Sequence, residues 1–156
     1  MLLACCLLTA AFVSVSVRSP RAGAAAGPGW SIGSAYTGDF PDPAILQVGS
    51  TYYGYSTSSA GGHIPVTRST DSGKTWIAVG DALPTVAGWA DSRDIWAPGV
   101  AFIGGQYQLY YAAPFRGAGG THCISRATSS SPSGPFVDSS SSPMVCQLPS
   151  GGSIDP

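Results

Sequence analysis

Two aspartates lie in closely similar tripeptides far apart in the chain. One is Asp42, in Pro-Asp-Pro at 41–43, and the other is Asp155, in Ile-Asp-Pro at 154–156. A pair of carboxylic groups suits the hydrolysis of an acetal, in which one acts as base or nucleophile and the other as acid. A single Asp-Pro pair is more often only a turn. Two of them at equivalent points of a repeat favour a shared site.

A third related segment, Trp96-Ala97-Pro98, lies between these tripeptides, and its spacing indicates a repeat. The prolines at 43, 98 and 156 are 55 and 58 residues apart. After each of the first two, the chain runs through an apolar stretch, a glycine turn and a tyrosine-rich stretch. This period is typical of a β-propeller blade. Since the first strand of each blade faces the central channel, we expect both aspartates to meet at one pocket.

The elements that must position these residues are strands. All eight acidic residues are aspartates, there is one lysine, and the 156 residues include 21 glycines and 13 prolines, which favours an all-β, turn-rich fold. We therefore expect two blades and the start of a third, as the N-terminal part of a longer propeller. The predicted strands are residues 44–48, 51–58, 64–69 and 76–79 in blade one, and 100–103, 106–112, 123–128 and 136–137 in blade two.

Three regions follow from the composition along the chain. Residues 1–26 contain an apolar run and are interpreted as a signal peptide, with a membrane anchor as the alternative. Residues 27–38 form a lead-in, and residues 39–156 form the partial propeller domain. We therefore expect a secreted protein, with no membrane contact after the signal is removed.

Four cysteines are present, and two of them lie outside the apolar run. These are Cys123 and Cys146, an even pair in a domain that is predicted to be exported. Such a pair predicts a disulfide. The alternative is two buried free thiols.

The ordered set of motifs resembles glycoside hydrolase family 43. The resemblance rests on Phe-Pro-Asp-Pro at 40–43, the tyrosine-rich run at 49–58, Trp-Ala-Pro at 96–98, and Gly-Gly-Ser-Ile-Asp-Pro at 151–156. It implies a five-bladed β-propeller and an inverting glycosidase of the arabinanase, arabinofuranosidase or β-xylosidase type. The substrate would be plant cell-wall polysaccharide that contains arabinose or xylose.

The resemblance also assigns roles to single residues. It makes Asp42 the general base, and Asp155 the group that tunes the pKa of the general acid and orients it. The family's acid is a glutamate from a later blade, and this chain contains none, so we expect residues 1–156 alone to be inactive. Trp96 and Phe115 are expected to line the sugar cleft, with packing between blades as the alternative for both. Gly99 stands where the family often has aspartate.

A second motif keeps other propeller functions open. Residues 69–76 fit the Asp-box pattern S-x-D-x-G-x-T-W of sialidases, which is a structural hairpin turn. The alternatives are therefore a sialidase-like propeller or a non-catalytic carbohydrate-binding propeller. A sialidase needs an arginine cluster for its substrate, whereas the arginines at 68, 93, 116 and 126 fall at different points of the blade repeat.

Composition and spacing also limit cofactors and partners. The formal net charge of −1 argues against nucleic acid as a partner. His63 and His122 are assigned to loops as surface or hydrogen-bonded structural residues, and no spacing resembles a zinc site. We expect a monomer without a cofactor, and the residues leave open a structural cation in the channel.

Overall fold

The computed structural model describes residues 36–156. The predicted signal peptide and most of the lead-in therefore lie outside the described residues. Within the described part, no helix is long and apolar enough to cross a membrane.

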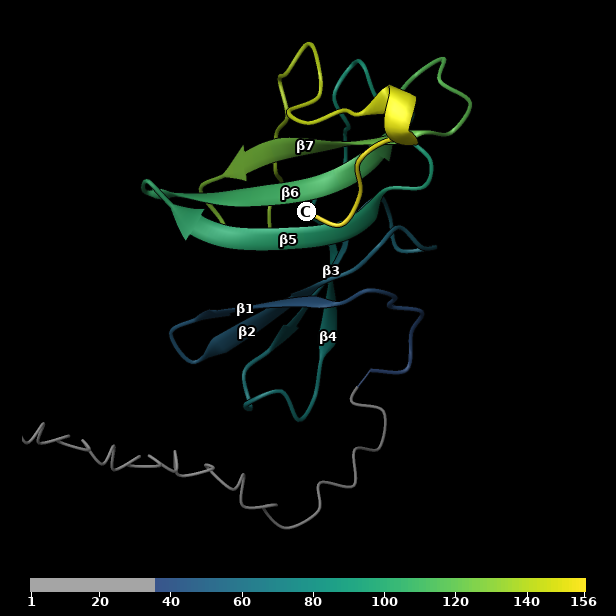
Figure 1. Ribbon diagram of the computed structural model, residues 1–156. Helices are drawn as coiled ribbons and strands as arrows, with labels where there is room; N and C mark the ends of the chain where they lie inside the picture. The colour runs from purple at the N-terminus through teal and green to yellow at the C-terminus, as the bar shows by residue number, and fades with distance from the viewer. Residues whose placement is uncertain (1–35) are drawn as a thin grey trace, which may run out of the picture. The chain divides into compact units, whose positions relative to one another are not determined.

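The described residues form two antiparallel sheets, each with its strands in sequence order (Figure 1). The first sheet contains β1 (Ala44–Val48), β2 (Thr51–Tyr55), β3 (Pro65–Ser69) and β4 (Ile77–Asp81). The second contains β5 (Trp96–Ile103), β6 (Gln106–Pro114) and β7 (His122–Ser129). A single 3₁₀ turn, η1 (Leu148–Ser150), follows near the C-terminal end of the described residues. The predicted all-β class is confirmed.

Short glycine-containing turns set the register of the hairpins. Ile103 pairs with Gln106, so Gly104 and Gly105 form a two-residue turn between β5 and β6. Both glycines have positive φ, 63° and 84°. A turn of this kind matches the twist of the flanking strands and excludes most side chains. The glycine turns that the sequence predicts after the first strand of each blade are confirmed.

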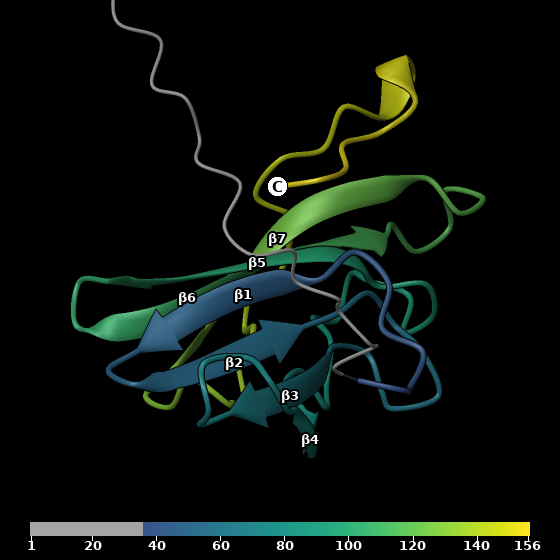
Figure 2. The same cartoon turned by 90° about the horizontal axis from the view of Figure 1, so that it is seen from below.

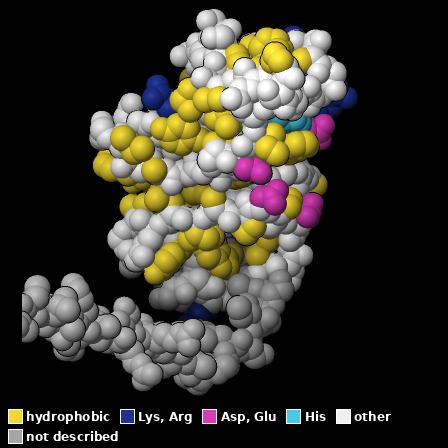
Figure 3. Space-filling view, in the orientation of Figure 1, with side chains coloured by type: hydrophobic (Ala, Val, Ile, Leu, Met, Phe, Trp, Pro, Cys, Tyr) yellow, Lys and Arg dark blue, Asp and Glu magenta, His cyan; other side chains and the backbone are white. Residues whose placement is uncertain are grey.

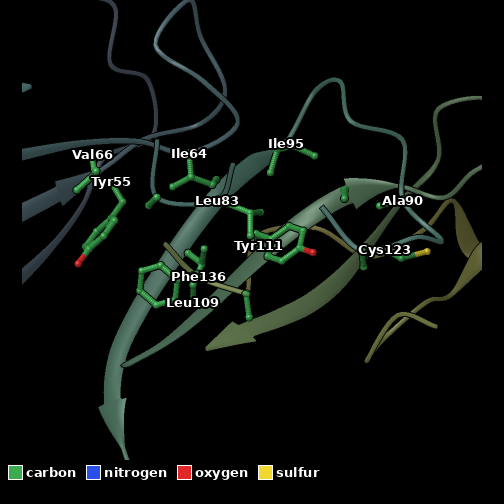
Figure 4. Close-up of a cluster of buried hydrophobic side chains, with 14 of the residues drawn as sticks. Tyr55, Ile64, Val66, Leu83, Ala90, Ile95, Leu109, Tyr111, Cys123 and Phe136 are labelled. Atoms are coloured by element: carbon green, nitrogen blue, oxygen red, sulfur yellow. The ribbon is translucent and has the colours of Figure 1, made fainter. Parts of the chain in front are cut away.

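The hydrophobic core lies between the two sheets, as it does between adjacent propeller blades. Tyr55 and Val66 of the first sheet are fully or almost fully buried, as are Leu109 and Tyr111 of the second. Figure 4 shows these side chains in one cluster with Phe136, whose ring meets that of Tyr55 edge to face with centroids 6.4 Å apart. Strands β1 and β5 contact each other, and Figure 2 shows them in adjacent layers.

The structure corrects two details of the predicted second blade. Residues 136–137 form only an isolated bridge, Thr128 with Val137, so this sheet has three strands. His122 was predicted in a loop, but it is the first residue of β7 and is buried. The sequence pattern misses this start of β7 because the nearby pair Gly119 and Gly120 is typical of a loop.

Candidate active site

The three proline motifs share an unusual backbone conformation. The residue before the proline is Asp42, Ala97 or Asp155, and φ is 48°, 45° and 56° respectively. Residues other than glycine rarely adopt this left-handed region, although aspartate tolerates it better than most. The same conformation at the same place in each motif shows that the sequence repeat is also a structural repeat.

The first motif is held against the end of β2. The Pro41 carbonyl oxygen accepts hydrogen bonds from the Thr57 backbone N–H at 3.1 Å and from the Ser56 hydroxyl at 2.9 Å. Asp42 itself is exposed, and its Oδ2 accepts a hydrogen bond from the Thr57 hydroxyl at 2.8 Å. The general base that the resemblance implies is therefore accessible to solvent but fixed at one oxygen.

The second motif lies directly beside the first. The Ser58 N–H donates to the Ile95 carbonyl oxygen at 2.8 Å, and the Ile95 N–H donates to the Ser58 hydroxyl at 3.2 Å. The Ala97 N–H donates to Oγ1 of Thr57 at 2.9 Å. These bonds join the end of β2 to the start of β5, so the first two motifs share one edge of the described domain.

The third motif returns to the start of β5. The Ser153 N–H donates to the His122 carbonyl oxygen at 2.8 Å. The Pro156 carbonyl oxygen lies 3.5 Å from the point where a Cβ on Gly99 would stand. Figure 1 shows the C-terminal end beside β5, and Figure 3 shows acidic side chains gathered on the side where β5 begins. Asp155 is exposed, and among the described residues no hydrogen bond joins its carboxylate to that of Asp42.

Trp96 presents an aromatic surface at this edge. Its side chain is 37% exposed, and its ring stacks on the ring of His122 with centroids 3.6 Å apart and planes 17° apart. Because Nε2 of His122 lies 2.8 Å from the Asp94 carbonyl oxygen, that nitrogen carries the hydrogen. His122 thus supports one face of the indole while part of the indole stays open to solvent.

Phe115 has a different environment. Its ring packs against the core and stacks on Trp89 with centroids 6.0 Å apart. It also borders a hollow of about 260 Å³ that Asp91, Arg93 and Asp94 line. Phe115 therefore makes the packing contacts that were the alternative to a role in the sugar cleft. It also lies at the wall of a polar hollow.

The Asp box forms the turn between β3 and β4. Asp71 accepts hydrogen bonds from the Thr75 hydroxyl at 2.7 Å, the Thr75 N–H at 2.9 Å and the Ser69 hydroxyl at 2.8 Å. These bonds, those from Thr75 first, lower the pKa of Asp71 to about 2. The predicted structural role of this motif is confirmed, since every bond serves the turn itself.

A partly buried polar network around Asp138 has no counterpart in the sequence patterns. Its carboxylate accepts hydrogen bonds from the Ser125 hydroxyl, from the Tyr111 hydroxyl at 2.7 Å and from the Ser140 N–H at 2.8 Å. Burial opposes ionisation, but the hydrogen bonds outweigh it and keep the pKa of Asp138 below its ordinary value. The network fastens the segment after β7 to the second sheet.

The two cysteines outside the N-terminal apolar run are bonded to each other. Cys123 and Cys146 are joined in a disulfide. Within residues 36–156, no group of three histidine, cysteine, aspartate or glutamate residues is arranged to hold a metal ion.

Comparison with known proteins places this chain among carbohydrate-active enzymes. The family model described as glycosyl hydrolases family 43 matches residues 35–156. A probable arabinan endo-1,5-alpha-L-arabinosidase A from Aspergillus flavus is 38% identical over 74 residues, which cover 46% of this chain and 22% of that protein. The chain thus matches under a quarter of this curated relative's length.

Two solved structures show the same arrangement of strands. The endo-arabinase from Bacteroides thetaiotaomicron is 31% identical with a TM-score of 0.53, over 68% of this chain and 34% of that one. The GH43_1 enzyme from Xanthomonas citri, solved with xylotriose, is 27% identical with a TM-score of 0.59, over 70% and 34% of the two chains. The described residues are accordingly part of a β-propeller, as predicted.

Proposed function

The chain belongs to glycosyl hydrolases family 43, and from that premise we propose that it forms part of the catalytic domain of an inverting glycosidase. The observation that carries this proposal is that Thr57 joins the first two proline motifs, with Asp42 exposed and hydrogen-bonded there. Family 43 enzymes hydrolyse O-glycosyl bonds, and the exposed carboxylate of Asp42 and the open ring surface of Trp96 are groups that such chemistry uses.

The proposed substrate class is arabinose- or xylose-containing polysaccharide. The Aspergillus flavus and Bacteroides thetaiotaomicron relatives are described as arabinan-cleaving enzymes, and the Xanthomonas citri enzyme was solved with xylotriose. Trp96 would bind the apolar face of a sugar ring with its open surface. Phe115 is proposed as a more distant wall of the cleft.

The proposed mechanism gives the two aspartates different tasks. Asp42 takes a proton from a water molecule, and that water attacks the anomeric carbon from the face opposite the leaving oxygen. A carboxylic acid protonates the leaving oxygen, and Asp155 orients this acid and raises its pKa by like-charge repulsion. The resemblance gives a glutamate as this acid, and none of the eight acidic residues is a glutamate, so we propose no residue among these 156 for that role.

We further propose that the protein is exported and acts as a monomer without a cofactor. The disulfide between Cys123 and Cys146 supports export, because disulfides persist in oxidising compartments. Residues 1–26, the proposed signal peptide, lie outside the described residues. Their removal is tested by sequencing the N-terminus of the secreted protein.

The first experiment assays the full-length protein and residues 1–156 on aryl arabinosides and xylosides, arabinan and arabinoxylan. We expect sugar release by the full-length protein only, with inverted anomeric configuration by NMR. Asp42→Asn is expected to lower kcat by about 10²–10⁴-fold, the usual contribution of a general base. Asp39→Asn, at an exposed aspartate nearby, is the control and should stay active.

Two outcomes would overturn this proposal. Unimpaired turnover by Asp42→Asn contradicts the role of the base. Binding of the polysaccharides by the full-length protein without any turnover favours the alternative, a non-catalytic carbohydrate-binding propeller.

A further inference from the structure

We propose that Thr57 is a positioning residue for Asp42, and that it leaves one carboxylate oxygen, Oδ1, free to receive the proton from water. The inference rests on the proposed function and deepens it. Neither the tripeptide motifs nor the comparisons point to Thr57.

Thr57 bonds to both of the first two proline motifs. Its backbone N–H donates to the Pro41 carbonyl oxygen at 3.1 Å. Its hydroxyl lies 2.8 Å from Oδ2 of Asp42 and 2.9 Å from the Ala97 backbone nitrogen. One residue just after β2 therefore fixes the base and ties it to the start of β5.

The directions of these two hydroxyl bonds are determined by chemistry. A backbone N–H can only donate, so Oγ1 of Thr57 accepts from Ala97. An ionised carboxylate can only accept, so the hydroxyl hydrogen of Thr57 points to Oδ2 of Asp42. The Ala97 N–H thus orients the hydroxyl, and the hydroxyl orients the carboxylate.

The threonine side chain is well suited to this task. Its branched Cβ restricts χ1, so the hydroxyl is held with little rotational freedom. Asp42 is exposed, so burial does not hold its side chain in one rotamer. Among the described residues its carboxylate has no hydrogen-bond donor other than Thr57.

The bond to Thr57 also distinguishes the two carboxylate oxygens. Oδ2 already accepts one hydrogen bond, which weakens it as a proton acceptor, whereas Oδ1 has no partner among the described residues. Catalysis by a general base depends first on geometry, and a small misplacement of the reacting atom can cost about 10²-fold in rate. The arrangement therefore leaves Oδ1 as the oxygen that can receive the proton from water.

The experiment compares Thr57→Val with Thr57→Ser in the full-length protein. Valine keeps the shape and removes the hydroxyl, while serine restores it. Thr128→Val is the matched control, because Thr128 is also half-buried and its hydroxyl makes no hydrogen bond within the described residues. Thr57→Ala replaces Thr57→Val if the valine variant does not fold.

We expect Thr57→Val to lower kcat by about 10- to 100-fold with KM changed less than about twofold. Thr57→Ser should recover most of this loss, and Thr128→Val should match the wild type. Crystal structures should show the Asp42 carboxylate in more than one rotamer in Thr57→Val and in one rotamer in Thr57→Ser. A purely structural role predicts a lower free energy of unfolding with kcat unchanged.

Failure of this inference differs from failure of the proposed function. An inactive wild type refutes the glycosidase activity, and the crystal structures alone then decide whether Thr57 holds Asp42. An unchanged kcat in Thr57→Val, or a single unchanged Asp42 rotamer in that variant, overturns the positioning role.

Discussion

Single residues at the candidate site hold backbone conformations that cost free energy. In the left-handed region the short polar side chain of Asp42 or Asp155 offers local hydrogen bonds, whereas the methyl group of Ala97 offers none. Such strain persists where the surroundings over-determine the conformation. For Ala97 the constraints are the hydrogen bond of its N–H to Thr57 and the proline that follows it.

Replacement of Ala97 by glycine tests this strain. Glycine adopts positive φ without steric cost, so Ala97→Gly should raise the free energy of unfolding by about 0.5–1 kcal/mol. The matched control is Ala101→Gly, on the same strand and also half-buried but without positive φ. That variant should lower the free energy of unfolding by about 0.5–1 kcal/mol. Urea unfolding measures both, and destabilisation by Ala97→Gly would show that the backbone there is not strained.

Among the elements, the hairpin of β3 and β4 depends most clearly on one charge. The ionised Asp71 accepts the hydrogen bonds that close the turn, and Ser72 and Gly73 at its tip have φ of 62° and 80°. The ring nitrogen of Trp76 donates to the Gly73 carbonyl oxygen at 3.0 Å and closes the turn from the other side. A protonated Asp71 cannot accept all of the hydrogen bonds that Thr75 and Ser69 donate to it.

This dependence predicts a specific loss of stability in acid. The pKa of Asp71 is about 2 in the folded protein and near 3.8 when unperturbed. A lowered pKa stabilises the fold above the unfolded value, and this contribution is lost as pH falls from about 4 to about 2. The urea midpoint of the wild type should therefore fall more between pH 5 and pH 2.5 than that of Asp71→Ala. Asp39→Asn serves as the control, and equal falls in wild type and Asp71→Ala would contradict the prediction.

At the scale of the whole described domain, the chain after β7 folds back over the second sheet. It is fastened by the bridges of Thr128 with Val137 and of Ile124 with Val145, and by the disulfide to Cys123. The bond from Ser153 to His122 follows, and it brings the last motif to the start of β7. These attachments hold the segment that leads to Asp155 against the second sheet.

Loss of the disulfide should loosen this return segment. The bond closes a loop with a sequence separation of 23 residues, and the chain-entropy relation gives a stabilisation of about 3 kcal/mol for a loop of this length. The double variant Cys123→Ser/Cys146→Ser is therefore expected to lose about 3 kcal/mol in urea unfolding. Dithiothreitol should destabilise the wild type to a similar extent and leave the double variant unchanged. An effect of the reductant on the double variant would point to another cause.

Much of the fold follows from local patterns along the chain. The apolar, glycine and tyrosine-rich stretches predict the first two strands of each sheet, and the Asp-box residues predict the turn before β4. Such features depend on neighbours within a few residues, or on a spacing that repeats, so the sequence alone predicts them. Asp42 and Asp155 were identified in the same way, from motifs that recur in the repeat.

The tertiary structure alone decided which residues support Asp42 and which distant residues meet elsewhere in the domain. Thr57 is 15 residues from Asp42 and 40 from Ala97, and Asp138 is 27 residues from Tyr111. The stacking of Trp96 on His122 likewise joins two strands of the second sheet. Contacts of this kind depend on how the end of one strand meets the start of another after the sheets have packed. No local pattern predicts these contacts, because the residues on either side of a threonine, histidine or alanine do not say which distant residue it will meet.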